Sequence, residues 1–208
     1  MAQKGAEGDH WAVIVAGSKN MWNYRHQASA CRAYQILKNN KVPEDQIIHF
    51  SFDDAVADRE NPFRGQLFNE PNGEDVYEGC KIDYRRDQVT TDNFIGAITS
   101  NQTMANLGQK VLKSGTKSKV FIYIVNHGAT GLLAFPNDEY LFADDFMNAL
   151  MLMKEKGLYE ELVIYLDGTQ SGSMFNGILP KNISVLAVTA TNENQSAFGA
   201  HCFPNDVV

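Results

Sequence analysis

Five short apolar runs constrain the fold of this 208-residue chain more than any other feature. Each run has five or six residues, is rich in β-branched and aromatic side chains, and shows no strict alternation of apolar and polar positions. The runs span residues 11–16, 47–52, 120–125, 162–166 and 183–188. Such runs are typical of strands that are covered on both faces, as in a parallel sheet.

Stretches with helical periodicity separate several of these runs. The first stretch carries Ala30 and Tyr34 on one apolar face, Thr90 or Thr91 suits the N-cap of the second, and Gly157 suits the end of the third. The predicted helices span residues 27–38, 91–100 and 143–156. Strands that alternate with helices predict right-handed crossovers and an α/β fold with a doubly wound sheet.

The length of the chain suits one α/β domain. We expect residues 1–9 to be an N-terminal tail and residues 10–208 to form a single domain, since the sequence shows no internal repeat and has no room for a second one. Residues 53–89 are rich in Asn, Pro, Gly and charged side chains. They predict a long surface excursion with little regular structure.

The charge and hydropathy of the sequence argue against two classes of partner. The formal net charge is -7 and no long cluster of basic residues occurs, so a nucleic-acid partner is not expected. No apolar run approaches the length of a membrane span, so a membrane role is not expected either. No signal peptide is visible at the start of the sequence.

The sequence contains three cysteines, Cys31, Cys80 and Cys202. An odd number without tight spacing argues against a disulfide framework. We expect Cys31 to lie on the first helix and in the core, Cys80 to lie in the excursion and Cys202 to follow the fifth strand. No Cys-x-x-Cys or His-x-x-x-His pair occurs, so the sequence predicts no metal site.

Polar residues follow three of the predicted strands. They are Asn23, Arg25 and His26 after the first, Asn126-His127-Gly128 after the third, and Asp167-Gly168-Thr169 after the fourth. Ligands bind at the carboxyl ends of strands in open parallel sheets, so we expect these three ends to converge on one site. Structural roles stay open at this point: His127 as a hydrogen-bonding group, Arg25 as a solvated charge and Asp167 as a helix cap.

The stretch that follows the fourth run, DGTQSGS, does not match three known chemistries. A serine-hydrolase elbow needs Gly-x-Ser-x-Gly, and neither Ser171 nor Ser173 has the required glycines. An aspartyl phosphotransferase strand reads Asp-x-Asp-Gly-Thr, but Tyr165 occupies the first Asp position. An aspartic protease needs Asp-Thr-Gly, and the order here is Asp-Gly-Thr.

The chain resembles the legumains, the asparaginyl endopeptidases of the caspase-like cysteine peptidases. The resemblance runs from His10 to about Cys202 and is carried by HWAVIVAGS, NYRHQA, CRAYQIL, NPFRGQLFN, VLKSG, VFIYIVNHGATGLLAFPND and SGSMFNGILPKNISVLAVTATN. It implies a three-layer caspase-like α/β fold with a mostly parallel central sheet and helices on both faces, here ending before the last strand. It also implies hydrolysis of peptide bonds after Asn, no cofactor, and a lysosomal, vacuolar or secreted location.

The resemblance assigns catalytic roles to four positions. His127 matches the catalytic histidine, Gly128 the glycine of the oxyanion region, and Asn23 the residue that orients the histidine. The nucleophile position, a cysteine in active members, holds Thr169. Asn126 also departs from the family, which usually has Asp before the histidine.

The resemblance also implies a pocket for the Asn side chain of a substrate. Its lining positions match Arg25, His26, Asp167 and Ser196. Asp167 is shorter than the Glu found in active members, and Ala197 stands where a second Ser is usual. The expected partner is a peptide or protein with Asn, and no oligomeric state is predicted.

A threonine is a poor substitute for the cysteine of such a site. The pKa of a cysteine thiol is roughly 8.5, and it is lower beside a histidine. The pKa of a threonine hydroxyl is several units higher, so the hydroxyl needs a hydrogen-bonded base to remove its proton. We expect a loss of at least ~10⁴-fold in turnover, which suggests a catalytically inactive homologue. Two alternatives stay open: a weak hydrolase that uses Thr169, or an incomplete or modified form of an active cysteine endopeptidase.

Overall fold

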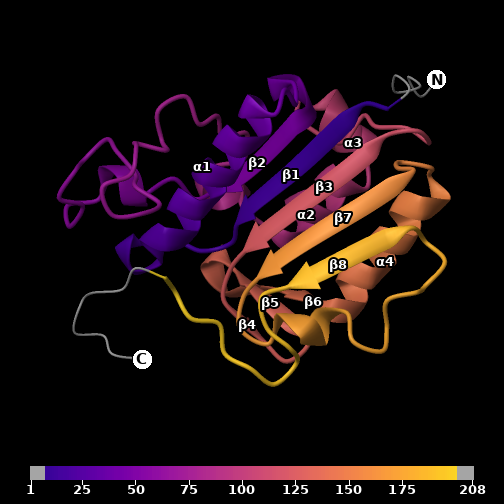
Figure 1. The fold of residues 1–208 in the computed structure, drawn as a ribbon. Coiled ribbons are helices and arrows are strands. Elements are labelled where there is room, and N and C mark those ends of the chain that lie inside the picture. The colour runs from indigo at the N-terminus through magenta and orange to yellow at the C-terminus, as the bar shows by residue number, and fades with distance from the viewer. Residues whose placement is uncertain (1–7, 201–208) are drawn as a thin grey trace.

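The computed structural model describes residues 8–200, and a five-stranded parallel sheet runs through its centre (Figure 1). The strand order across the sheet is β2-β1-β3-β7-β8. These strands are β1 (His10–Ala16), β2 (Ile47–Ser51), β3 (Lys119–Val125), β7 (Glu161–Asp167) and β8 (Val185–Thr189). All five predicted strands and their parallel arrangement are therefore confirmed, with ends that differ by two residues at most.

The register of the three central strands decides where the site lies. Ala16 at the end of β1 pairs with Val125 at the end of β3, and Val125 pairs with Asp167 at the end of β7. Three consecutive strands in the sheet therefore end level with one another. The loops that leave them begin at the same edge of the sheet.

The three predicted helices are present and cover both faces of the sheet. They are α1 (Tyr24–Asn39), α2 (Thr91–Ile98) and α4 (Ala143–Glu155). The Thr90 side chain caps α2 by accepting a hydrogen bond of 3.1 Å from the Asn93 amide, and Gly157 follows α4 with a φ of +63°. Helix α1 lies on one face and α2 and α4 on the other (Figure 1), which gives the three layers of the caspase-like arrangement. No helix among residues 8–200 is both long and apolar enough to cross a lipid bilayer.

Several short elements were not foreseen from the sequence. They are α3 (Gln102–Asn106) and a small antiparallel sheet of β4 (Gly128–Ala129), β5 (Leu132–Phe135) and β6 (Glu139–Phe142). The turns of this sheet use Gly131 at a φ of +74° and Asn137 at +64°. Strands of two to four residues are too short for a periodic apolar pattern, so turn chemistry was their only signal.

The excursion of residues 53–89 is mostly irregular, as predicted, with two 3-10 turns at Ala55–Ala57 and Arg86–Gln88. It is not only a surface feature, however. Val56, Leu67 and Val76 are buried in the cluster that also holds the inner face of α1. The segment therefore completes the core on that face of the sheet.

A disulfide joins Cys31 on α1 to Cys80 in the excursion, with a Cα–Cα distance of 5.6 Å. The sequence-based argument against a disulfide was wrong. The two cysteines are 49 residues apart, and only the packing of the excursion against α1 brings them together. The chain-entropy treatment of cross-links gives about 4 kcal/mol of stabilisation for a closed loop of this length.

Candidate active site

A cavity of about 1110 Å³ opens at the carboxyl ends of the central strands. Arg25 and His26 enter it from the start of α1, His127 from the end of β3, and Asp167 and Thr169 from the end of β7. The predicted convergence of three strand ends is confirmed. Five of the eight predicted site residues line one cavity.

His127 is held by a short chain of hydrogen bonds. Its Nε2 atom lies 2.5 Å from the Asn23 side-chain oxygen, and the Asn23 amide nitrogen donates to the Lys19 carbonyl oxygen at 2.7 Å. Because the Asn23 amide is engaged by Lys19, its oxygen faces the ring and accepts the Nε2 proton. We infer that Nδ1 of His127 carries the lone pair, so Asn23 sets both the orientation and the tautomer of the ring.

The surroundings of both histidines of the cavity disfavour their charged forms. Burial and the nearby Arg25 charge lower the pKa of His127 below its usual range. His26 packs edge-on against His127 with ring centroids 4.9 Å apart, and its Nδ1 lies 2.7 Å from the Ser18 hydroxyl. Burial, Arg25 and His127 together lower the pKa of His26 to about 3. A neutral His127 can accept a proton, which a general base must do.

Two glycines let the loops after β3 and β7 pack backbone against backbone. A Cβ atom on Gly128 would lie 2.6 Å from the Thr169 carbonyl oxygen, and one on Gly168 would lie 2.8 Å from the Asn126 carbonyl oxygen. The backbone amide of Asn126 also donates a hydrogen bond of 2.9 Å to the backbone carbonyl oxygen of Asp167. The histidine loop and the threonine loop are therefore fixed against each other, with no space for a side chain between them.

Thr169 is not paired with the histidine. Its hydroxyl oxygen accepts a hydrogen bond of 3.1 Å from the Ala197 amide. Among residues 8–200, no hydrogen bond joins this hydroxyl to the His127 ring. Gln170 follows in the left-handed region with a φ of +54°, and its amide donates to the Gln195 carbonyl oxygen at 2.8 Å. The turn that presents Thr169 is thus fixed by the segment around residues 195–197.

Arg25 and Asp167 bring opposite charges to the cavity. The Arg25 guanidinium donates to the Trp22 carbonyl oxygen at 2.9 Å and stays exposed. Packing around the Asp167 carboxylate raises its pKa, while the Arg25 charge opposes the rise. A guanidinium and a carboxylate together offer donors and acceptors to a side-chain amide.

The remaining three predicted residues do not line the cavity. Asn23 lies behind His127, and Gly128 lies against the Thr169 carbonyl oxygen. Ser196 is exposed and directly precedes Ala197, which does line the cavity.

One wall of the cavity was missed by sequence reasoning. It comes from the excursion and includes Pro62, Phe63, Phe68 and Pro71. The rings of Phe63 and Phe68 meet edge-on, with centroids 5.4 Å apart. The composition of the excursion predicts loop structure but not its position, so only the NPFRGQLFN stretch signalled its importance.

The comparisons with known proteins show the family of the chain. Over residues 10–208 the chain matches the sequence model described as the Peptidase C13 family. It is 44% identical over 202 residues to the vacuolar-processing enzyme delta-isozyme of Arabidopsis thaliana, which covers 97% of this chain and 43% of that relative. It is 44% identical over 196 residues to the legumain of Rattus norvegicus, covering 93% and 45%, and 43% identical over 197 residues to the hemoglobinase of Schistosoma mansoni, covering 95% and 45%.

The chain spans less than half the length of these relatives. Within that span, the match covers the sheet, the helices on both faces and every residue of the cavity described above. The chain therefore belongs to the peptidase C13 family.

Proposed function

We propose that this chain is a legumain-like asparaginyl endopeptidase homologue that binds Asn-containing peptides and hydrolyses them very slowly, if at all. The observation that carries the proposal is the hydroxyl of Thr169, which accepts a hydrogen bond from the Ala197 amide and makes none with His127. The relatives named legumain and vacuolar-processing enzyme support the endopeptidase ancestry.

Peptide binding is supported by the walls of the cavity. Arg25 and Asp167 offer a donor and an acceptor for the amide of an Asn side chain, and His26 on α1 lines the same cavity. Phe63 and Phe68 offer aromatic surface in this cavity for neighbouring residues of the peptide. We assign Ser196 to the rim of the same pocket, next to Ala197.

The chemistry of attack supports slow or absent hydrolysis. A nucleophile must add to the carbonyl carbon of the peptide bond, and His127 must take up the nucleophile's proton and pass it to the leaving amine. A thiolate can attack without passing its proton to a base at that moment, whereas an alcohol needs a hydrogen-bonded base. Because the Thr169 hydroxyl and the His127 ring are not paired, we expect turnover at least ~10⁴-fold below that of a cysteine in the same position.

The test pairs binding with cleavage on the wild-type chain. A fluorescent peptide with one Asn and a matched peptide with Gln in its place are titrated first, and each is then incubated with the protein and analysed by mass spectrometry. We expect tighter binding of the Asn peptide and no cleavage above the buffer blank. Cleavage after Asn that is lost in Thr169→Ala would instead establish the chain as a weak threonine-dependent hydrolase.

The family also supports a lysosomal or vacuolar location for this chain. Fractionation of cells that express it, with antibodies against the chain, tests that location. Recovery only with cytosolic markers would contradict it.

A further inference from the structure

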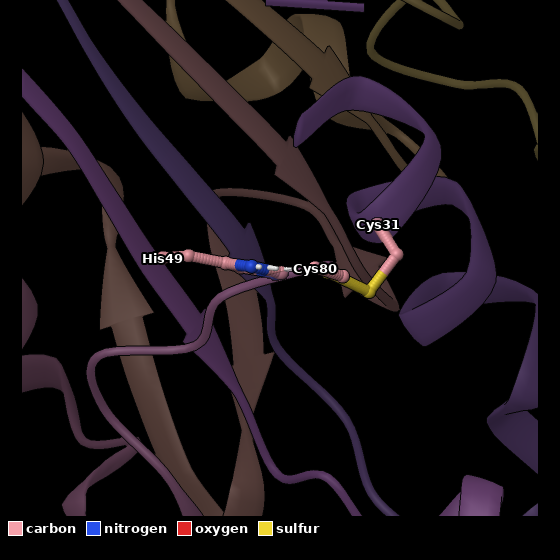
Figure 2. Close-up of side chains that lie close together, drawn as sticks. All are labelled: Cys31, His49 and Cys80. Carbon is pink, nitrogen blue, oxygen red and sulfur yellow. Dashed lines mark hydrogen bonds between the residues drawn. A yellow bond between two sulfur atoms is a disulfide. The ribbon is translucent and has the colours of Figure 1, made fainter. Parts of the chain in front are cut away.

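Three buried side chains from three different segments meet beneath α1 (Figure 2). Cys31 lies on α1, His49 on β2 and Cys80 in the excursion. Their exposed fractions are 1%, 0% and 8%. The possible ligand atoms of the three side chains all lie within 4.8 Å of one another. None of the three residues lines the active-site cavity.

We propose that reduction of the Cys31–Cys80 disulfide converts this cluster into a zinc site with Cys31, His49 and Cys80 as ligands. The two sulfur atoms then either form the disulfide or bind the metal. The proposal does not depend on the peptidase function, because it uses no residue of the cavity.

The distances in the cluster suit tetrahedral zinc. With Zn–S of about 2.3 Å and Zn–N of about 2.0 Å, a tetrahedral site separates a sulfur and a nitrogen ligand by about 3.5 Å and two sulfurs by about 3.8 Å. The possible ligand atoms already lie within 4.8 Å of one another, and the Cys80 sulfur lies 3.7 Å from the His49 ring at Nδ1. Small side-chain rotations can bring Nε2 and the two sulfurs to these separations while the Cα atoms of the two cysteines stay 5.6 Å apart. Two sulfurs that are no longer bonded need a similar separation in any case.

His49 is prepared as a metal ligand. Its Nδ1 lies 2.9 Å from the Lys81 carbonyl oxygen, while its buried Nε2 has no hydrogen-bond partner. The ring stacks against Tyr34, with centroids 6.0 Å apart. A metal-bound imidazole coordinates through one ring nitrogen and donates from the other to a nearby acceptor, which here is the Lys81 carbonyl oxygen, so Nε2 is the nitrogen that would bind the metal.

The charge of the filled site suits its buried surroundings. Two thiolates, one neutral imidazole and Zn²⁺ sum to zero, so the filled site adds no net charge beside Arg85 and Lys110. The cluster has no carboxylate, which disfavours Ca²⁺ and Mg²⁺, whereas thiolate and imidazole favour zinc. Three protein ligands leave a fourth coordination position open.

Zinc replaces the disulfide in two steps. A dithiol reductant, such as a thioredoxin-type protein or dithiothreitol, supplies two electrons and two protons to the sulfurs of Cys31 and Cys80 and itself becomes a disulfide. Zinc then binds both sulfurs, and the two thiol protons leave to the solvent. Both the disulfide and the zinc site connect α1 to the excursion. This connection, which holds one wall of the cavity, would therefore persist under reducing conditions.

The test uses Co²⁺ as a spectroscopic probe for the zinc site. The chain, with Cys202→Ser to remove the third thiol, is reduced with a phosphine, freed of reductant under nitrogen and titrated with Co²⁺. We expect thiolate-to-cobalt charge-transfer absorption at one Co²⁺ per chain, bleached by Zn²⁺, in the reduced protein and not in the oxidised protein. His49→Gln should weaken Co²⁺ binding at least about tenfold, as losses around metal ligands do, whereas His10→Gln at an exposed histidine should not.

A second measurement tests zinc binding without relying on the Co²⁺ spectrum. Zn²⁺ should protect Cys31 and Cys80 of the reduced chain from alkylation, as read by peptide mass spectrometry. If circular dichroism shows that the reduced chain unfolds, Zn²⁺ should restore its helical signal. The proposal is overturned if Co²⁺ produces no thiolate band, if His49→Gln binds as tightly as wild type, or if Zn²⁺ neither protects the cysteines nor restores the fold.

Discussion

The two sides of the active-site cavity differ in how their central side chains are held. On one side, His127 is oriented by Asn23, which is itself fixed by the Lys19 carbonyl oxygen. On the other side, the Thr169 hydroxyl accepts from the Ala197 amide and makes no hydrogen bond with the His127 ring. His127 is thus held in a fixed orientation, whereas the Thr169 hydroxyl, the nucleophile position of the proposed function, is a weakly acidic alcohol held away from it. Under the proposed function, the difference between the two sides places the chemical defect in the Thr169 side chain and not in the residues that hold His127.

The largest expected effect comes from removing the His127 side chain, which we compare in the Thr169→Cys chain and in the wild-type chain. In Thr169→Cys, the added change His127→Ala should lower kcat/KM by about 10³-fold or more, because the leaving amine loses its proton donor. In the wild-type chain the same change should leave the rate at the blank. His10→Ala, at an exposed histidine, is the matched control. Equal rates with and without His127 in the Thr169→Cys chain would break the comparison.

The next effect concerns the contact between the two sides. Gly128→Ala adds a Cβ atom only 2.6 Å from the Thr169 carbonyl oxygen, so the two loops must separate. We expect a loss of about 1 to 3 kcal/mol in the free energy of unfolding, measured by urea denaturation. Ala129→Ser, at the neighbouring exposed position, should change it little. An unchanged midpoint for Gly128→Ala would contradict the close packing of the loops.

A smaller effect tests the role of Asn23 on the histidine side. In the Thr169→Cys background, Asn23→Ala should lower kcat by about tenfold to a hundredfold, because the His127 ring loses its fixed orientation. KM should change little, since Asn23 does not line the cavity. Asn23→Asp keeps the acceptor oxygen but loses the donor to the Lys19 carbonyl oxygen, so it should recover only part of the rate that Asn23→Ala loses. A change in KM alone would make Asn23 part of the binding surface instead.

The smallest effect is the pH dependence of stability on the histidine side. Burial lowers the pKa of His26 from 6.5 to about 3, so the folded state resists protonation that the unfolded chain accepts. The contribution of His26 to stability is therefore complete above pH 6.5 and is lost as the pH falls toward 3. We expect a loss of roughly 1 to 2 kcal/mol between pH 7 and pH 5 in wild type.

His26→Gln should flatten this pH dependence, and His10→Gln should not. Urea denaturation at several pH values measures both variants beside wild type. Equal slopes for wild type and His26→Gln would place the acid sensitivity elsewhere, for instance at His49.

Much of the fold was accessible from the sequence because its main elements leave a strong periodic signal. Runs such as 120–125 are apolar on both faces and became strands of the central sheet, and the helix starting after Thr90 was marked by its cap. The small antiparallel sheet of β4, β5 and β6 left no such signal. The Cys31–Cys80 pair was misjudged, because spacing along the chain says nothing of how an irregular segment packs.

Some residues of the candidate site could likewise be predicted from the sequence, and others could not. Residues directly after strand ends, such as His127 and Thr169, were foreseen because parallel strands end at one edge. The wall with Phe63 and Phe68 was not, because tertiary contacts alone position that irregular segment. The bond between the Thr169 hydroxyl and the Ala197 amide also depends on the path of a loop that no pattern specifies.

The central claim is that one side chain limits hydrolysis, and the ratio of kcat/KM for Thr169→Cys to that of wild type tests it most directly. Both proteins are assayed on the same Asn-containing peptide, with circular dichroism to show equal folding. We predict a ratio of at least ~10⁴. A ratio near one, with wild type cleaving after Asn and Thr169→Ala inactive, would contradict the account.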